Sequence, residues 1–187
     1  MNIRVRFSKY GFLKFIGHLD VMRYFQKAMR RADVDIRYSE GFSPHQIMSF
    51  AAPLGVGITS KGEYVDIEVL DTENSKKMID RLNAVMSEGF EILEYKLLPD
   101  DAANAMSIVA AADYSLVFRP GYEPEKESPE EWFEKLVRFF DADHVMIMIK
   151  TKKGEREMDL KPFVYELNVR KNGEVPALFM KVSAGSA

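Results

Sequence analysis

The side chains best suited to acid–base chemistry occur early in the chain. His18 and Asp20 lie at the start of a predicted helix, and His45 lies in the loop region that follows it. Histidine titrates near neutral pH, so it can act as a general acid or base or donate to a phosphate. His18 and Asp20 diverge around a helix, and His18 and His45 can converge only through the fold. Alternatively, His18 and Asp20 satisfy backbone donors at the helix start.

A second group of residues is suited to binding an anion or a base. Residues 1–50 hold nine Lys or Arg and four Asp or Glu, a net charge of +5, whereas the remainder carries −8. A localised basic region can bind phosphates, and a neighbouring aromatic loop can stack on bases. The predicted RNA- or ligand-binding residues are Arg23, Lys27, Arg30, Arg31, Tyr38, Phe42, Ser43 and His45. A solvated helix face and a tight turn anchored by its aromatic residues are the alternatives.

Composition narrows the class of protein. The 187 residues are 47% hydrophobic and 29% charged, which is typical of a globular protein. Cysteine is absent, which excludes disulfides, zinc fingers and a cysteine-bound iron–sulfur cluster. The common phosphate-loop, dinucleotide-binding, zinc-protease and serine-hydrolase motifs are missing, so we expect no metal site and no cofactor. The uncharged stretch 41–60 is broken by Pro and Gly, so we expect no membrane span and a cytoplasmic protein.

Hydrophobic periodicity predicts the elements that must position these residues. Alternation over residues 2–7 predicts a half-buried strand, and a 3.6-residue apolar stripe predicts a helix over 18–32. The same reasoning predicts a short strand at 36–38, a strand at 63–70, a helix at 75–88 and a strand at 90–97. The order β-α-β-β-α-β predicts an α+β protein with the split βαβ, or ferredoxin-like, pattern.

The second half is expected to begin after a linker at 99–104. A strand is predicted at 108–119, and Ser128, Pro129 and Glu131 form a helix-start signature. Further strands are predicted at 144–150, 157–170 and 177–183. This order resembles the first half without its closing elements, so we expect two ferredoxin-like copies in tandem with the second C-terminally incomplete. The predicted subdomains are 1–98, which includes the basic helix and the 38–62 loop, and 105–187.

Several segments resemble a bacterial family of unknown function usually called radical SAM-linked, or radical SAM-associated, proteins. They are residues 4–9, 14–20, 38–45, 49–57 and 62–64. The resemblance implies a protein that occurs alone or fused behind a radical SAM enzyme, in genetic company that suggests RNA or ribosome biology. It assigns no catalytic residues. Because this chain has no cysteine, it cannot hold a radical SAM cluster and would be at most an accessory of such an enzyme.

Three functions follow as hypotheses. The leading one is a noncatalytic accessory module that binds tRNA or rRNA for a radical SAM protein. The second is a metal-independent RNA-processing endonuclease that uses His18 or His45 as its acid–base group. The third is a protein-docking domain for a radical SAM partner without RNA binding, which would use the open strand face of Tyr64, Asp66 and Glu68 together with the acidic second half.

Overall fold

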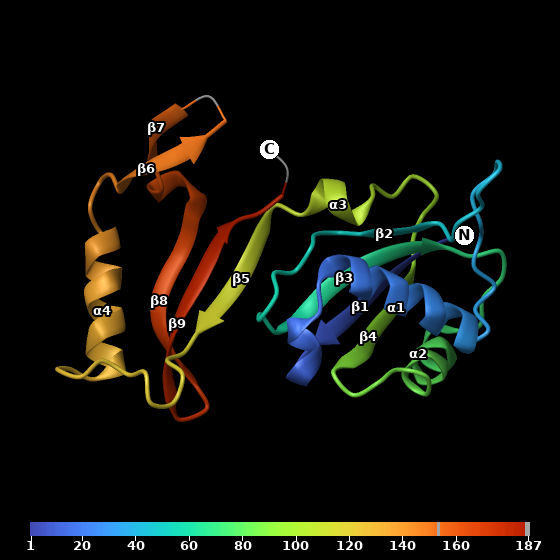
Figure 1. Ribbon diagram of the computed structural model, residues 1–187, viewed down its shortest axis with the longest axis horizontal. Coiled ribbons are helices and arrows are strands. Elements are labelled where there is room, and N and C mark those ends of the chain that lie inside the picture. The colour runs from blue at the N-terminus through green and yellow to red at the C-terminus, as the bar shows by residue number, and fades with distance from the viewer. Residues whose placement is uncertain (153, 186–187) are drawn as a thin grey trace. The chain divides into compact units, whose positions relative to one another are not determined.

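The protein is a mixed α/β structure with several antiparallel sheets, seen in a computed structural model that describes residues 1–152 and 154–185 (Figure 1). The chain divides into two compact units, Met1–Val109 and Ala110–Ala187. The predicted second subdomain starts at residue 105. The second unit starts later, at Ala110, because the short helix at Ala105–Ile108 belongs to the first unit. No helix in the described parts of the chain is long and apolar enough to cross a membrane.

The first unit is built on a four-stranded antiparallel sheet with the order β2-β3-β1-β4. Its elements are β1 (Asn2–Lys9), a 3-10 turn η1 (Gly11–Phe15), α1 (His18–Arg31), β2 (Met48–Phe50), β3 (Ser60–Glu68), α2 (Ser75–Asn83), β4 (Phe90–Leu97) and α3 (Ala105–Ile108). The observed order β-α-β-β-α-β matches the prediction, but its second strand is β2 at Met48–Phe50 and not the segment 36–38. The predicted short strand at 36–38 forms only isolated bridges, Ile36 with Val69 and Tyr38 with Gln46.

Helices α1 and α2 cover one face of this sheet (Figure 1). Alternate residues of β1 and β3 point to that face because side chains along a strand alternate between its two sides. Phe7 of β1 and Phe25 of α1 meet there with ring centroids 4.6 Å apart. Phe50 and Phe90 complete the aromatic cluster, with centroids 5.5 Å from that of Phe25. This apolar core fixes α1 on the sheet and leaves its opposite side in solvent.

The other face of the sheet carries ion pairs. Arg4 Nε and Nη2 donate to the two carboxylate oxygens of Asp66 at 2.8 and 2.9 Å. Asp66 also accepts the backbone N–H of Ala105 at 2.7 Å, which holds the segment before α3 against the sheet. The predicted open face is therefore partly covered by a segment of the same unit.

The second unit contains a three-stranded antiparallel sheet of order β5-β9-β8 and a separate two-stranded pair, β6-β7. Its elements are β5 (Ala111–Leu116), α4 (Pro129–Phe140), β6 (Met146–Thr151), β7 (Gly154–Asp159), a 3-10 turn η2 (Lys161–Phe163), β8 (Val164–Asn172) and β9 (Val175–Ser183). The predicted start of α4 is confirmed, since Ser128 and Glu131 form a reciprocal capping box.

The boundaries of three predicted elements need correction. The predicted strand 157–170 is two strands, because the chain turns through η2, where Pro162 cannot donate a ladder hydrogen bond. The predicted helix 75–88 ends at Asn83, whose side chain bonds the N–H and C=O of Ile92 at 2.7 and 3.0 Å. The predicted strand 108–119 is shortened to β5: Ile108 ends α3, and residues 117–119 lie beyond the strand. The two units differ in strand order, so the tandem copy stays a prediction.

Candidate functional site

The predicted aromatic loop is a short hairpin that starts after Ile36. Ser39 N–H donates to the carbonyl of His45 at 2.8 Å, and Ile47 N–H donates to the carbonyl of Arg37 at 2.9 Å. Between these bonds the chain reverses through Gly41, whose φ of +106° is a conformation that favours glycine. Phe42 at the tip has a relative exposure of 111%, so its ring contributes nothing to the core. The interpretation of the loop as a turn anchored by its aromatics does not hold for Phe42.

Gln46 ties this hairpin to α1. Its side chain is 4% exposed, and its amide N–H group donates to the carbonyl of Gln26 at 3.2 Å and to the hydroxyl of Tyr38 at 3.4 Å. Buried amides are normally held by such hydrogen bonds, because leaving them unpaired costs free energy. The bond to Gln26 therefore fixes the exposed hairpin beside the middle of the helix.

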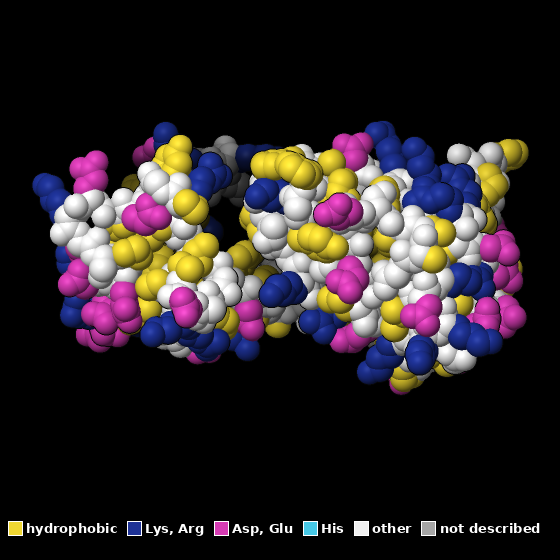
Figure 2. All heavy atoms as spheres, turned by 90° about the horizontal axis from the view of Figure 1, so that it is seen from below, with side chains coloured by type: hydrophobic (Ala, Val, Ile, Leu, Met, Phe, Trp, Pro, Cys, Tyr) yellow, Lys and Arg dark blue, Asp and Glu magenta, His cyan; other side chains and the backbone are white. Residues whose placement is uncertain are grey.

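The basic residues of α1 form a stripe on its solvent side. Arg23, Lys27 and Arg30 are exposed and recur at i, i+4 and i+7, which places them on one side of the helix. The core-facing residues Val21 and Phe25 lie on the other side. Figure 2 shows Lys and Arg side chains gathered over one region of the first unit, with acidic and hydrophobic side chains scattered over the rest. We call Arg23, Lys27 and Arg30 the basic stripe.

Two of the predicted phosphate ligands already have partners. The Arg31 guanidinium lies over the ring of Tyr24 at 5.5 Å and donates to the carbonyl of Val85 at 3.1 Å. Arg31 therefore links α1 to the end of α2. Arg23 forms an exposed pair with Asp20 at 3.4 Å, which is weak and leaves the cation accessible.

The imidazole of His45 belongs to the hairpin itself. Its Nδ1 lies 2.9 Å from the hydroxyl of Ser39, and its backbone N–H donates to the same oxygen at 3.1 Å. The carbonyl of Ser43 lies 3.4 Å from Nδ1. These contacts set the ring orientation of an exposed histidine within the hairpin.

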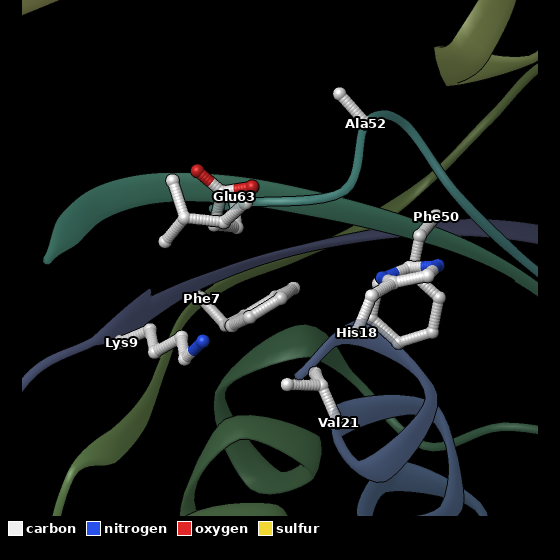
Figure 3. Close-up of a pocket in the computed structure, with 8 residues that line it drawn as sticks. Phe7, Lys9, His18, Val21, Phe50, Ala52 and Glu63 are labelled. Carbon is white, nitrogen blue, oxygen red and sulfur yellow. The ribbon is translucent and has the colours of Figure 1, made fainter. Parts of the chain in front are cut away.

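His18 lies elsewhere, at the wall of a small cavity at the start of α1 (Figure 3). Two further ionisable residues, Lys9 of β1 and Glu63 of β3, line the same cavity. The remaining wall is apolar and consists of Phe7, Val21, Phe50, Ala52 and Leu54. We call this space the Lys9 cavity. It offers about 10 Å³ to a water-sized molecule, which is room for one water.

The strand pattern explains why two charged residues point inward. Ile3, Val5 and Phe7 alternate toward the core, so Lys9 is the next inward position of β1. Val65 and Ile67 do the same on β3, and Glu63 continues that series in the direction of the strand start. These two residues were not predicted as site residues. Extending the two-residue period by one step, past Phe7 on β1 and before Val65 on β3, would have found both.

Burial shifts the ionisation of both groups. Removal from water lowers the pKa of Lys9, and the nearby charge of Glu63 partly opposes this. Burial likewise raises the pKa of Glu63, opposed by a hydrogen bond from Ser60 and by the charge of Lys9. Both pKa shifts favour the neutral forms of Lys9 and Glu63. His18 packs edge-on against Phe50 with ring centroids 5.4 Å apart.

The structure thus separates the predicted site residues into two places. Tyr38, Phe42, Ser43 and His45 lie on the hairpin, and Arg23, Lys27 and Arg30 form the basic stripe of α1; the bond from Gln46 to the carbonyl of Gln26 links the hairpin to this helix. The predicted acid–base candidates do not converge: His18 lines the Lys9 cavity, Asp20 is exposed beside Arg23, and His45 is not among the lining residues. Across residues 1–152 and 154–185, no cluster of three or more His, Asp or Glu side chains could hold a metal ion.

A family model described as "uncharacterized protein conserved in bacteria (DUF2344)" matches residues 2–187. The chain belongs to this family. The match covers both units, so the hairpin, the basic stripe and the Lys9 cavity all lie within the family domain. No curated protein matches the chain.

Proposed function

We propose that the first unit binds RNA, of the tRNA or rRNA class, through the hairpin and the basic stripe. The observation that carries this proposal is the bond from Gln46 to the carbonyl of Gln26, which links the hairpin and its exposed aromatic rings to the helix that carries the basic stripe. Phosphates would contact the stripe, and an unpaired base would stack on Phe42 or Tyr38. Ser43 and His45 would add polar contacts at the same hairpin.

The finer fold assignment is also a proposal. We propose that the first unit is ferredoxin-like, supported by its β-α-β-β-α-β order and by the strand order β4-β1-β3-β2. The idea that the second unit is a diverged copy rests on its opening β-α-β order alone.

A place beside a radical SAM enzyme is the second part of the proposed function. The support is the sequence resemblance to radical SAM-linked proteins together with the absence of cysteine, which rules out a cysteine-bound cluster in this chain and leaves it the role of an accessory in this proposal. In this role the protein would present RNA to the cluster-bearing partner. Such a complex would form in the cytoplasm, where both RNA and enzyme occur.

Fluorescence anisotropy with labelled tRNA across a salt series tests RNA binding. Three phosphate contacts by the stripe predict a slope of log K against log salt of about −2 to −3. Lys27→Glu with Arg30→Glu should abolish most of the affinity, because two contacts become repulsive. Arg31 is left intact in this variant, since it holds α2. The control is Lys76→Glu with Lys96→Glu, which makes the same change of charge at exposed positions on α2 and β4.

The outcomes separate the alternatives. Equal losses in the stripe variant and in the control would mean that net charge, not the stripe, governs binding. No binding at low salt would favour the protein-docking alternative, tested by co-purification with a radical SAM protein. Cleavage of the RNA in EDTA, lost in His18→Ala or His45→Ala, would favour the endonuclease alternative.

A further inference from the structure

The turn η1 exposes two aromatic rings that belong to neither the hairpin nor the basic stripe. This turn joins β1 to α1 (Figure 1), and its Phe12 and Phe15 are 90% and 60% exposed. Side chains three residues apart in a 3-10 helix lie above one another. The two rings therefore lie on the same side of the turn, and we call them the aromatic platform. Apolar side chains exposed together in this way mark an interaction surface.

The turn is held in place at both ends and in its middle. Before it, the N–H of Tyr10 donates to the carbonyl of Gly89 at 2.9 Å. After it, Nζ of the buried Lys9 donates to the carbonyl of Ile16 at 2.9 Å. Between these bonds the side chain of Leu13 packs against the apolar core. The platform is thus ordered before any ligand arrives, which lowers the entropic cost of binding to it.

The charge around the platform suits an anionic ligand. The chain has no Asp or Glu before Asp20, and Asp20 is paired with Arg23. Nζ of Lys14 lies 5.1 Å from the centroid of the Phe15 ring. Leu19 is exposed four residues before Arg23, so it continues the side of α1 that carries the basic stripe. The exposed surface therefore runs from aromatic rings beside a lysine to the cations of the stripe.

This combination favours a polyanion that also carries flat apolar groups. In an RNA duplex the faces of the bases are stacked on one another, whereas a single strand leaves them open to a protein. Aromatic side chains stack on such bases with little dependence on sequence, while cations contact the backbone. Acidic protein surfaces pair with cations as well, but their carboxylates offer the two rings nothing to stack on.

We propose that the first unit binds single-stranded RNA, with an unpaired base stacked on the aromatic platform. The phosphates next to this base contact Lys14 and the basic stripe. This inference rests on the proposed RNA binding and names its substrate class: an unpaired segment, such as a loop or a single-stranded end, rather than a duplex. The platform is separate from Phe42 of the hairpin, so its contribution can be measured by itself.

Fluorescence anisotropy with two labelled probes tests the proposal: a single-stranded oligouridylate and a blunt-ended RNA duplex of equal length. Phe12→Ala with Phe15→Ala should weaken oligouridylate binding at least about fivefold, the lower limit for the loss of one stacked base. The same variant should leave duplex affinity within about twofold, because a duplex offers no base face. Lys27→Glu with Arg30→Glu should weaken both probes.

Two further variants separate stacking from apolar contact. Phe12→Leu with Phe15→Leu keeps an apolar surface without aromatic rings and should lose most of the oligouridylate affinity that the Ala variant loses. Phe12→Tyr with Phe15→Tyr keeps the rings and should bind like the wild type. The matched control is Phe139→Ala with Phe163→Ala, which removes two exposed rings from the second unit and should leave both affinities unchanged.

The outcomes distinguish this inference from the proposed function. Unchanged oligouridylate binding by the Ala variant, with both probes weakened by the stripe variant, refutes the platform and leaves RNA binding standing. Equal losses of strand and duplex affinity in the Ala variant also refute it, as does wild-type binding by the Leu variant. A selective loss of strand affinity in the Ala variant supports the platform even where the stripe variant has no effect. Failure of the wild-type chain to bind either probe refutes both proposals.

Discussion

The Arg4–Asp66 pair should contribute far more to the stability of the first unit than the neighbouring Arg6–Glu94 pair. Both join β1 to an adjacent strand, but their exposure differs. The side chains of Arg4 and Asp66 are 18% and 13% exposed, whereas those of Arg6 and Glu94 are 35% and 53% exposed. Water and salt screen the second pair, so it should be worth at most about 1 kcal/mol.

Asp66→Asn keeps the size of the side chain and removes its charge. The carboxylate accepts two bonds from Arg4 and one from Ala105 N–H, and the amide can no longer accept at both positions. Hydrogen bonds to charged groups contribute about 1.5–3 kcal/mol each, and breaking a buried pair costs about 3–5 kcal/mol. Because the pair is not fully buried, we expect a loss of about 3 kcal/mol, or about 10 °C in Tm.

Urea denaturation followed by far-UV circular dichroism measures this loss. Trp132, the only tryptophan of the chain, lies in the Ala110–Ala187 unit, so its fluorescence reports on the second unit separately. Glu94→Gln is the matched control and should cost less than about 1 kcal/mol. Equal costs for Asp66→Asn and Glu94→Gln, or a cost below about 1 kcal/mol for both, would refute the reasoning from burial.

Two further predictions concern single side chains. Asn83→Ala should lower the free energy of unfolding of the first unit by about 2–4 kcal/mol, because it leaves the N–H and C=O of buried Ile92 without their partner. Urea denaturation checks this, and Asn83→Asp, which can still accept from the N–H of Ile92, should restore part of the loss. The pKa of Asp159 is lowered to about 2, mainly by the hydrogen bond with His144 and further by backbone N–H groups. Its folded pKa lies below the ordinary value of 3.8, so this stabilisation is present above about pH 4 and is lost as pH falls toward 2. Urea denaturation monitored by Trp132 fluorescence should show the loss in wild type and not in Asp159→Asn.

Local patterns predicted most of the elements of the first unit. Helix α1 was expected over 18–32 and runs from His18 to Arg31, because an apolar stripe of helical period is a signal within one segment. The capping box at Ser128 is equally local and is also confirmed. Both signals depend on residues three or four positions apart, which the sequence displays directly.

The features that make the candidate sites depend on contacts between distant residues. Gln46 reaches the carbonyl of Gln26 across twenty positions, and no local rule pairs an amide with one particular carbonyl. Lys9 and Glu63 come together because β1 and β3 are neighbours in the sheet, with Phe7 opposite Glu63 in the register. The sequence shows which residues of each strand point toward the core, but the pairing of β1 with β3 is a property of the fold.

Helix α1 carries the basic stripe on one side and core-facing residues on the other, and this geometry predicts that changes to the stripe leave the fold intact. His18 and Arg23 are five residues apart, which places them roughly 140° apart around a helix of 3.6 residues per turn. The basic stripe therefore faces solvent while His18 turns toward the core side, where Phe50 lies. Lys27→Glu with Arg30→Glu should therefore weaken tRNA binding and leave the free energy of unfolding of the first unit within about 1 kcal/mol, because both side chains are exposed. Urea denaturation beside the anisotropy measurement checks this. A loss of tRNA affinity that comes with unfolding of the first unit would mean that these residues support the fold rather than contact the RNA.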